Sequence, residues 1–116
     1  TVLGRGSVCI NSGGEKIFVE EVENALKAHP AVYDAIVVGV DDERWGQRGI
    51  GLVAITPGAP DPGEAALRDH CRGHIAGYKV PKEIYTVGEV FRGPNGKADY
   101  KLSKQRATQL SAQRSG

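Results

Sequence analysis

Two apolar runs near the middle of the chain limit its fold more than any other feature. Residues 35–40 read Ala-Ile-Val-Val-Gly-Val, and residues 50–56 read Ile-Gly-Leu-Val-Ala-Ile-Thr. β-branched residues favour strands, and an apolar run without alternation is typical of a strand buried on both faces. We therefore predict a central strand over residues 35–40, a polar loop over residues 41–49, and a second strand over residues 50–56 that runs antiparallel to the first.

A helix is predicted before these strands. Apolar side chains recur at helical spacing over residues 20–28, and Pro30 stops the helix because it forces the residue before it out of helical geometry. The expected inward face holds Val19, Val22, Ala25 and Leu26, and the expected solvent face holds Glu20, Glu23, Asn24 and Lys27.

A second helix is predicted after the Pro/Gly-rich loop at residues 56–63. Asp61 is expected to be its N-cap, Pro62 its first residue and Glu64 its third, because these residue types favour those positions. Gly77 is expected to end it, as glycine commonly does at a helix C-terminus. The residues expected to face inward are Leu67, Cys71 and Ile75.

The first residues of the chain have the pattern of a β-hairpin. Short apolar runs at residues 8–10 and 17–19 flank a polar turn that contains Gly13 and Gly14. Glycine reaches the positive φ angles of tight hairpin turns, and it also leaves the backbone open to a ligand. An ordinary tight hairpin explains this pattern as well.

The remaining elements complete the expected architecture. A short strand is predicted over residues 83–87, and good helix formers from about Lys101 predict a last helix, followed by a disordered tail at residues 111–116. This order predicts a small α+β domain: a three-stranded, mostly antiparallel sheet flanked by helices, with an N-terminal two-stranded hairpin.

Composition excludes several functional classes. The chain has 116 residues, which suits one compact domain, and its formal net charge of +1 gives no sign of nucleic-acid binding. No apolar run approaches the ~20 residues that a transmembrane helix needs, and no targeting segment is apparent. Cys9 and Cys71 lack the spacing of a metal site or a disulfide framework, so we expect reduced thiols in a cytoplasmic protein.

One pair of histidines has a spacing that a metal site could use. His70 and His74 lie four residues apart on the second predicted helix, with Cys71 beside them. Because no further ligands are apparent, we favour a solvated helix face and predict no metal ion at this position.

A lysine held by a tight turn is the main candidate for chemistry. Lys97 follows Gly93-Pro94-Asn95-Gly96, residue types that restrict a turn. A lysine fixed in this way could neutralise the negative charge that develops in phosphoryl or acyl-phosphate chemistry. A solvated loop lysine is the alternative, and the pattern alone does not exclude it.

An ordered series of motifs extends from about Gly4 to Leu102. They are Gly4-Arg5, Ser12-Gly13-Gly14-Glu15, Glu21-Val22-Glu23, His29-Pro30-Ala31-Val32, the stretch at residues 35–47, Tyr78-Lys79-Val80-Pro81-Lys82 and Asn95-Gly96-Lys97. Taken together, these motifs resemble the C-terminal domain of the adenylate-forming enzymes, of the acyl-CoA synthetase type, and their order and spacing make a chance match improbable. This superfamily comprises acyl-CoA synthetases, peptide-synthetase adenylation domains and luciferases.

The resemblance implies an ATP-dependent acyl-CoA synthetase that activates a carboxylic acid, most simply a fatty acid, as an acyl-adenylate and transfers it to coenzyme A. ATP, Mg²⁺ and coenzyme A would take part. Lys97 would be catalytic in the first step, and Arg5 would contact the nucleotide. The domain would then rotate so that Ser12, Gly13 and Gly14 line the passage for coenzyme A.

The resemblance also implies how the chain is divided. Residues 1–8 would form a hinge segment centred on Gly6 and Ser7, although the family more often has Asp or Lys where Ser7 stands. Residues 9–110 would form the mobile domain. The absence of methionine and the start at Thr1 favour a piece of a longer protein whose large N-terminal domain is the partner. Alone, the piece is expected to be inactive.

Two alternatives remain at this point. A peptide-synthetase adenylation subdomain would pass its acyl group to a carrier protein. A non-catalytic binding module would keep the fold and lose the chemistry, and Lys97 argues against this second alternative. The atypical Ala98-Asp99-Tyr100 sequence after Lys97 places a carboxylate close to that lysine, and we expect Asp99 to cap the last helix and not to pair with Lys97.

Overall fold

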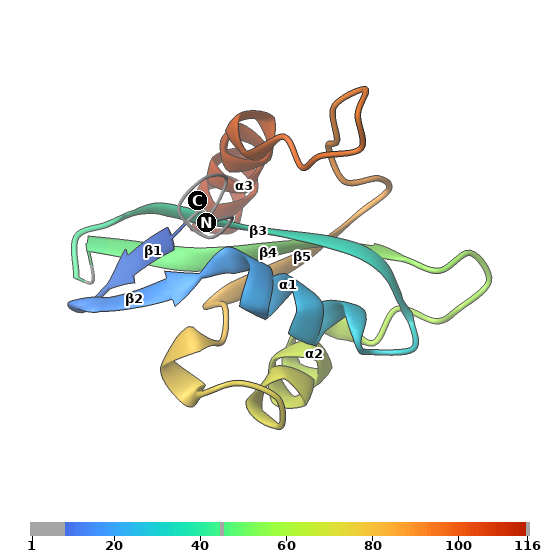
Figure 1. Ribbon diagram of the computed structural model, residues 1–116, viewed down its shortest axis with the longest axis horizontal. Coiled ribbons are helices and arrows are strands. Elements are labelled where there is room, and N and C mark those ends of the chain that lie inside the picture. The colour runs from blue at the N-terminus through green and yellow to red at the C-terminus, as the bar shows by residue number, and fades with distance from the viewer. Residues whose placement is uncertain (1–8, 45, 116) are drawn as a thin grey trace.

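One sheet carries helices on both of its faces. The computed structural model describes residues 9–44 and 46–115. Its elements are β1 (Cys9–Ser12), β2 (Glu15–Phe18), α1 (Val19–Lys27), β3 (Val32–Asp42), β4 (Gly46–Ile55), α2 (Gly63–Arg72), the 3₁₀ helix η1 (Gly77–Lys79), β5 (Glu83–Val87) and α3 (Tyr100–Ser115). Helices α1 and α2 lie on one face of the sheet and α3 lies on the other (Figure 1). The predicted α+β class is confirmed.

Strand β4 is the centre of the sheet. It pairs antiparallel with β3 over its whole length and parallel with β5 from Ile50 to Ala54. At its first residue, Gly46, it also pairs antiparallel with Ser12 of β1. The prediction that residues 35–40 form the central strand is therefore wrong, because β3 lies at an edge. Its burial on both faces comes from the two helical layers.

Strands β3 and β4 are longer than the sequence predicts. They continue in register to the pair Asp42–Gly46, so most of the predicted loop at residues 41–49 is strand. The side chains in this extension are polar, yet its backbone groups still pair across the ladder. Arg48 supports the extension through ion pairs with Asp42 at 3.3 Å and Glu83 at 3.1 Å.

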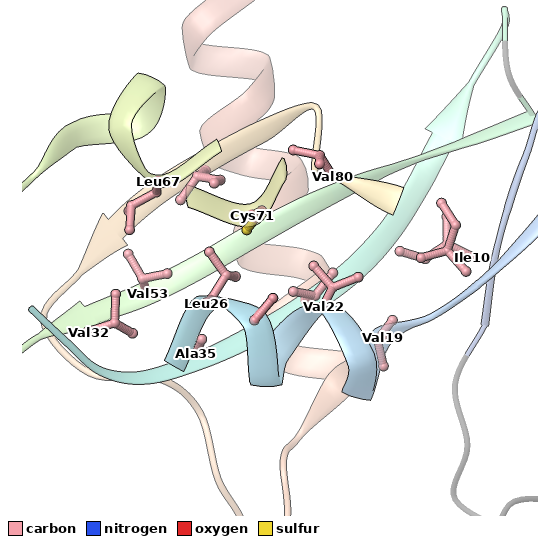
Figure 2. Close-up of a cluster of buried hydrophobic side chains, with 14 residues drawn as sticks. Ile10, Val19, Val22, Leu26, Val32, Ala35, Val53, Leu67, Cys71 and Val80 are labelled. Carbon is pink, nitrogen blue, oxygen red and sulfur yellow. The ribbon is translucent and has the colours of Figure 1, made fainter. Parts of the chain in front are cut away.

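Alternate residues of β3 feed two separate cores, as the period of two along a strand requires. Ala35 and Val37 point toward α1 and α2, where they join Leu26, Val53 and Leu67 in the cluster drawn in Figure 2. The other face of the sheet packs against α3 through Ile36, Val38, Val40, Ile50, Leu52, Ala54, Val90 and Ala107.

Helix α1 lies one residue earlier than its predicted range of 20–28 and does not match all of its predicted faces. Val19, Val22, Ala25 and Leu26 are buried, as expected. Glu23 was predicted to face solvent, but only 7% of it is exposed. The prediction fails because Glu23 turns toward the free edge of β3, where its carboxylate accepts a hydrogen bond from the Val37 amide at 2.9 Å.

Helix α2 begins and ends at other residues than predicted. Pro62 takes the N-cap position, while Asp61 lies one residue earlier and accepts a hydrogen bond from the Gly63 amide at 2.8 Å. The helix ends at Arg72 with Gly73 as its C-cap, and Gly77 instead opens η1.

The inward residues of this region lie as predicted, although one of them is outside the helix. Leu67 and Cys71 are buried against the sheet. Ile75 packs partly buried against the same core, and its amide bonds back to the Cys71 carbonyl at 2.9 Å in the turn that follows α2.

Helix α3 begins at the predicted cap and continues further than predicted. A carboxylate oxygen of Asp99 accepts a hydrogen bond from the Leu102 amide at 3.1 Å, which confirms its capping role. The helix then runs to Ser115, so residues 111–115 are helical and not the disordered tail expected. Ser111 is buried and its hydroxyl binds the guanidinium of Arg48.

No helix in the part of the chain that the structure describes is both long and apolar enough to span a bilayer.

Candidate functional site

Lys97 stands at the end of a turn whose backbone is closed by its own hydrogen bonds. The Gly93 amide donates to the Lys97 carbonyl at 2.8 Å, and the Lys97 amide donates to the side-chain oxygen of Asn95 at 3.1 Å. Gly96 has φ +83°, a conformation that favours glycine. Both backbone groups of Lys97 are therefore bonded within the turn, while its side chain is exposed.

An arginine ties this turn to β3. The guanidinium of Arg92 donates to both carboxylate oxygens of Asp34, at 2.7 Å and 2.6 Å. A third bond runs from Arg92 to the carbonyl of Gly96 at 3.1 Å, directly before Lys97. The hydrogen bonds from Arg92 hold the pKa of Asp34 below its ordinary value, so the pair stays ionised at neutral pH.

A buried carboxylate ties down the other end of the turn. The hydroxyl of Tyr100, the first residue of α3, donates to Glu23 at 2.9 Å. Burial raises the pKa of Glu23 above its ordinary value, and the hydrogen bonds from the Val37 amide and Tyr100 oppose part of this rise. Glu23 thus joins α1, the edge of β3 and the start of α3 at one point.

The second candidate region is the tip of the β1–β2 hairpin. Its two turn residues, Gly13 and Gly14, have φ +60° and +87°, the positive values that a tight hairpin turn requires. A Cβ added to Gly14 would meet no atom within 4 Å, and both glycines are exposed. Ser12 ends β1 directly before them. The tip therefore presents bare backbone to its surroundings.

A notch of two glycines seats this hairpin on the sheet. Gly39 and Gly49 lie directly opposite each other on β3 and β4. The side chain of Ile10 fills the space above them: a Cβ added to Gly39 would lie 3.0 Å from it, and one added to Gly49 would lie 3.4 Å from it. A hydrogen bond from the Asn11 amide to the side-chain oxygen of Gln47, at 2.9 Å, adds to this contact.

The structure does not bring the two candidate regions together. The Lys97 turn is bound to Asp34 near the start of β3, whereas Ser12 pairs with Gly46 opposite Asp42, at the other end of that strand. Asp34 and Asp42 are eight residues apart in β3, which corresponds to roughly 26 Å at about 3.3 Å per residue. Figure 1 shows the loop before α3 and the hairpin tip at opposite ends of the molecule.

Three of the residues singled out from the sequence, Arg5, Gly6 and Ser7, lie outside the described residues. Their assignments as nucleotide contact and hinge stay predictions.

The histidines pack against each other. The His70 and His74 rings are 4.4 Å apart, and the His29 ring lies 5.0 Å from that of His70. The Nε2 atom of His70 donates to the carbonyl of Ala25 at 2.8 Å, so His70 links α2 to α1. His74 follows the end of α2 and is exposed.

Both cysteines are free thiols. Cys71 is buried, and burial raises its pKa to about 11, which makes it a poor nucleophile.

Sequence reasoning missed the residues that hold the Lys97 turn in place. Asp34 and Arg92 are 58 positions apart, and Glu23 and Tyr100 are 77 positions apart. A helix-face pattern placed Glu23 in solvent. The one sequence signal for this contact was the position of Glu23, an acidic residue next to a strongly apolar helix face.

Comparison with known proteins decides the family. The family profile for the AMP-binding enzyme C-terminal domain matches residues 21–97, which include most of α1, the strands from β3 to β5, and the Lys97 turn. The chain belongs to this family. The match to an AMP-binding enzyme C-terminal domain confirms the resemblance that the motifs predicted.

Individual relatives agree with this assignment. A medium/long-chain-fatty-acid–CoA/3-oxocholest-4-en-26-oate–CoA ligase of Mycobacterium marinum is 57% identical over 105 residues, 90% of this chain and 19% of its own length. A 2-succinylbenzoate–CoA ligase of Geobacillus kaustophilus is 50% identical over 91 residues, 78% of this chain and 18% of its own. The crystal structure of an acyl-CoA synthetase of Brucella canis superposes with a TM-score of 0.84 at 30% identity, covering 93% of this chain and 20% of that one. The chain thus spans about a fifth of the length of these relatives.

Proposed function

We propose that the chain is the C-terminal domain of an ATP-dependent acyl-CoA synthetase that forms an acyl-adenylate and then transfers the acyl group to coenzyme A. The separation of two exposed turns, the one at Lys97 and the one at Gly13–Gly14, is the main support for this proposal. The Lys97 turn is bound to Asp34 and the hairpin pairs opposite Asp42, two positions of β3 that are roughly 26 Å apart along the strand. One end cannot serve the same reaction centre as the other without a rotation of the whole domain. Two half-reactions, each using one end, account for both features.

In the first half-reaction the Lys97 end faces the large domain. The carboxylate of the acid attacks the α-phosphate of ATP, and pyrophosphate leaves. The ammonium group of Lys97 lies between the carboxylate and phosphate oxygens and offsets the charge that develops there. The closed turn supports this role because it fixes the backbone on both sides of Lys97.

In the second half-reaction the hairpin end faces the large domain. We assign the rotation to the hinge segment at Gly6 and Ser7, and a nucleotide contact to Arg5, the one charged side chain of residues 1–8. The turn formed by Ser12, Gly13 and Gly14 then lines the passage for the pantetheine arm of coenzyme A. Because no side chain projects from Gly13 or Gly14, the thiol can approach the adenylate closely along the backbone.

The domain contributes charge and shape but no metal ligands in this proposal. Mg²⁺ commonly accompanies ATP in phosphoryl chemistry. Across residues 9–44 and 46–115, however, no group of three or more His, Cys, Asp or Glu side chains could hold a metal ion. Mg²⁺ would then be held chiefly by the phosphates of ATP.

A fatty acid is the proposed substrate class. Relatives that are 57% and 50% identical to this chain over 105 and 91 residues are named for ligation of medium- and long-chain fatty acids, of 3-oxocholest-4-en-26-oate and of 2-succinylbenzoate to coenzyme A. Such different acids with one type of C-terminal domain support an acyl pocket in the remaining four-fifths of the enzyme. They also favour coenzyme A over a carrier protein as the acceptor. The two free thiols suit a reducing compartment, and we propose the cytoplasm.

The test uses the full-length enzyme that carries this chain, with a panel of carboxylic acids. One assay follows pyrophosphate release without coenzyme A, and a second follows thioester formation with it. We expect acid-dependent pyrophosphate release, thioester formation that depends on coenzyme A, and no turnover by the 116-residue chain alone. Acid-independent ATP hydrolysis, or transfer to a carrier protein only, would contradict the proposal.

A further inference from the structure

Residues 94–97 of the Lys97 turn place no side chain against the sheet, and the apolar residues that pack in the core, Val90 and Ala98, lie on either side of the turn. Pro94, Asn95, Gly96 and Lys97 are all exposed. Its internal hydrogen bonds fix its shape, but a turn bonded only to itself could still swing as a unit about its two ends. The position of Lys97 relative to the domain therefore depends on what holds those two ends.

The first end is held by a charged contact that only arginine can make. The guanidinium of Arg92 uses three donor atoms at once: Nε and Nη2 toward Asp34, and Nη1 toward the carbonyl of Gly96. It therefore joins β3 to the backbone unit directly before Lys97. A lysine at this position would keep the charge but lose the planar fork of donors.

The second end is held by the buried carboxylate of Glu23. Tyr100 lies three residues after Lys97 and donates its hydroxyl to this carboxylate, which the amide of Val37 also binds. Glu23 is 7% exposed, so its place is set by packing and by both donors. Arg92 and Tyr100 thus attach the turn on either side to β3 and α1, elements that do not belong to the turn.

We propose that Arg92 and Tyr100 are positioning residues for Lys97, and that they act through Asp34 and Glu23. The inference rests on the proposed function of Lys97 in adenylation. Fixing both ends keeps the ammonium group at one place when the domain closes over the acid and ATP. A displacement of about 1 Å at a reacting group can cost roughly 100-fold in rate.

Substitution of Arg92 by lysine in the full-length enzyme tests this directly. We expect Arg92→Lys to lower the maximal rate of adenylate formation by roughly 10- to 100-fold, because Lys97 is misplaced and not removed. The Michaelis constants for ATP and for the acid should stay within about twofold of the parent values, because Lys97 acts mainly in the transition state. The rate of thioester formation from supplied acyl-adenylate should also stay within about twofold of the parent rate, because Lys97 takes no part in that step. Arg72→Lys is the matched control: Arg72 forms an exposed ion pair with Asp69 at 3.5 Å, and its variant should behave as the parent enzyme.

Two further variants address the same contacts. Tyr100→Phe removes only the hydroxyl and should slow adenylate formation by a smaller factor, roughly 3- to 10-fold. Adding Asp34→Asn to Arg92→Lys should cost no more than about a further twofold, because the two residues act through one contact. Hydrogen exchange of the peptide at residues 91–99 should be faster in Arg92→Lys and unchanged in Arg72→Lys.

The outcomes separate this inference from the proposed function. If Lys97→Ala abolishes adenylate formation while Arg92→Lys and Tyr100→Phe keep the parent rate, the positioning inference alone is wrong. Equal loss of both half-reactions in Arg92→Lys would also overturn it, because that result indicates a general defect of the domain. If Lys97→Ala itself leaves adenylate formation unchanged, the proposed function is wrong and the positioning inference is wrong with it.

Discussion

Replacing Tyr100 by phenylalanine removes one hydroxyl group from the contact between α3 and Glu23. That hydroxyl lies 2.9 Å and 3.2 Å from the two carboxylate oxygens. A hydrogen bond to a charged group contributes about 1.5–3 kcal/mol, and the ring that remains still fills the space. We therefore expect the free energy of unfolding of the 116-residue chain to fall by about 2 kcal/mol at neutral pH. Urea denaturation followed by circular dichroism measures the difference.

The pH dependence of this loss identifies its cause. Burial raises the pKa of Glu23 above the ordinary value of 4.5, and the Tyr100 hydroxyl opposes the rise. In the unfolded chain Glu23 loses its proton near pH 4.5, whereas in the folded chain it keeps that proton to a higher pH. The free energy of unfolding therefore falls as the pH rises from about 4.5 through the raised pKa. Tyr100→Phe raises that pKa further. The difference between variant and parent should be largest above the raised pKa and should narrow as the pH falls toward 4.5.

Tyr33→Phe provides the matched control. Tyr33 is 71% exposed on β3, and loss of its hydroxyl should change stability by less than about 0.5 kcal/mol at any of these pH values. The reasoning is refuted if Tyr100→Phe unfolds at the same urea concentration as the parent at neutral pH. It is also refuted if the difference between them widens on acidification.

Two further predictions concern the hairpin and the thiols. In the full-length enzyme, Gly14→Ala should slow thioester formation and leave adenylate formation unchanged. Gly58→Ala is the control and should slow neither step. Both glycines have positive φ (+87° and +86°) and open surroundings, so each alanine should cost a similar backbone energy of about 1 kcal/mol. Equal effects of the two variants on thioester formation would exclude a role for Gly14 beyond folding. In a thiol assay of the native chain, Cys9 should react and Cys71 should react only on unfolding, because burial raises the Cys71 pKa to about 11; two equally reactive thiols would contradict the structure.

Elements with a strong local pattern could be predicted from the sequence. The apolar run at residues 35–40 forms most of β3 because each of its faces meets a helix. The pattern could not show that β3 lies at the edge, since burial by helices and burial by neighbouring strands select the same apolar residues. The ends of β3 and β4 were taken for a loop because their side chains are polar, but their backbones still pair and Arg48 forms ion pairs with Asp42 and Glu83.

The last helix extends past its predicted end for a similar reason. Ser103, Ala107 and Ser111 recur every fourth residue and are buried against the sheet. Two of the three are serines, so the sequence pattern does not predict an apolar helix face. Small side chains nevertheless let the helix approach the sheet closely. The sequence therefore suggested a tail where the structure has a packed helix.

The candidate site also has a part that could be predicted from the sequence and a part that could not. The Lys97 turn could be predicted because Pro94, Asn95 and Gly96 encode it locally. Its attachment could not, because Arg92 meets an aspartate 58 positions earlier in the chain. The helix pattern placed Glu23 in solvent, and only the folded chain brings the Val37 amide of β3 and the Tyr100 hydroxyl of α3 to its buried carboxylate.

The central claim is that Lys97 acts in one half-reaction and is absent from the other. Its most direct test measures both half-reactions in the full-length enzyme with Lys97→Ala, with Lys101→Ala as an exposed lysine control four residues away. We predict that adenylate formation falls by about 100- to 1,000-fold, since a charge at the transition state is lost, while thioester formation from supplied acyl-adenylate keeps the parent rate. Adenylate formation at the parent rate in Lys97→Ala would contradict the account.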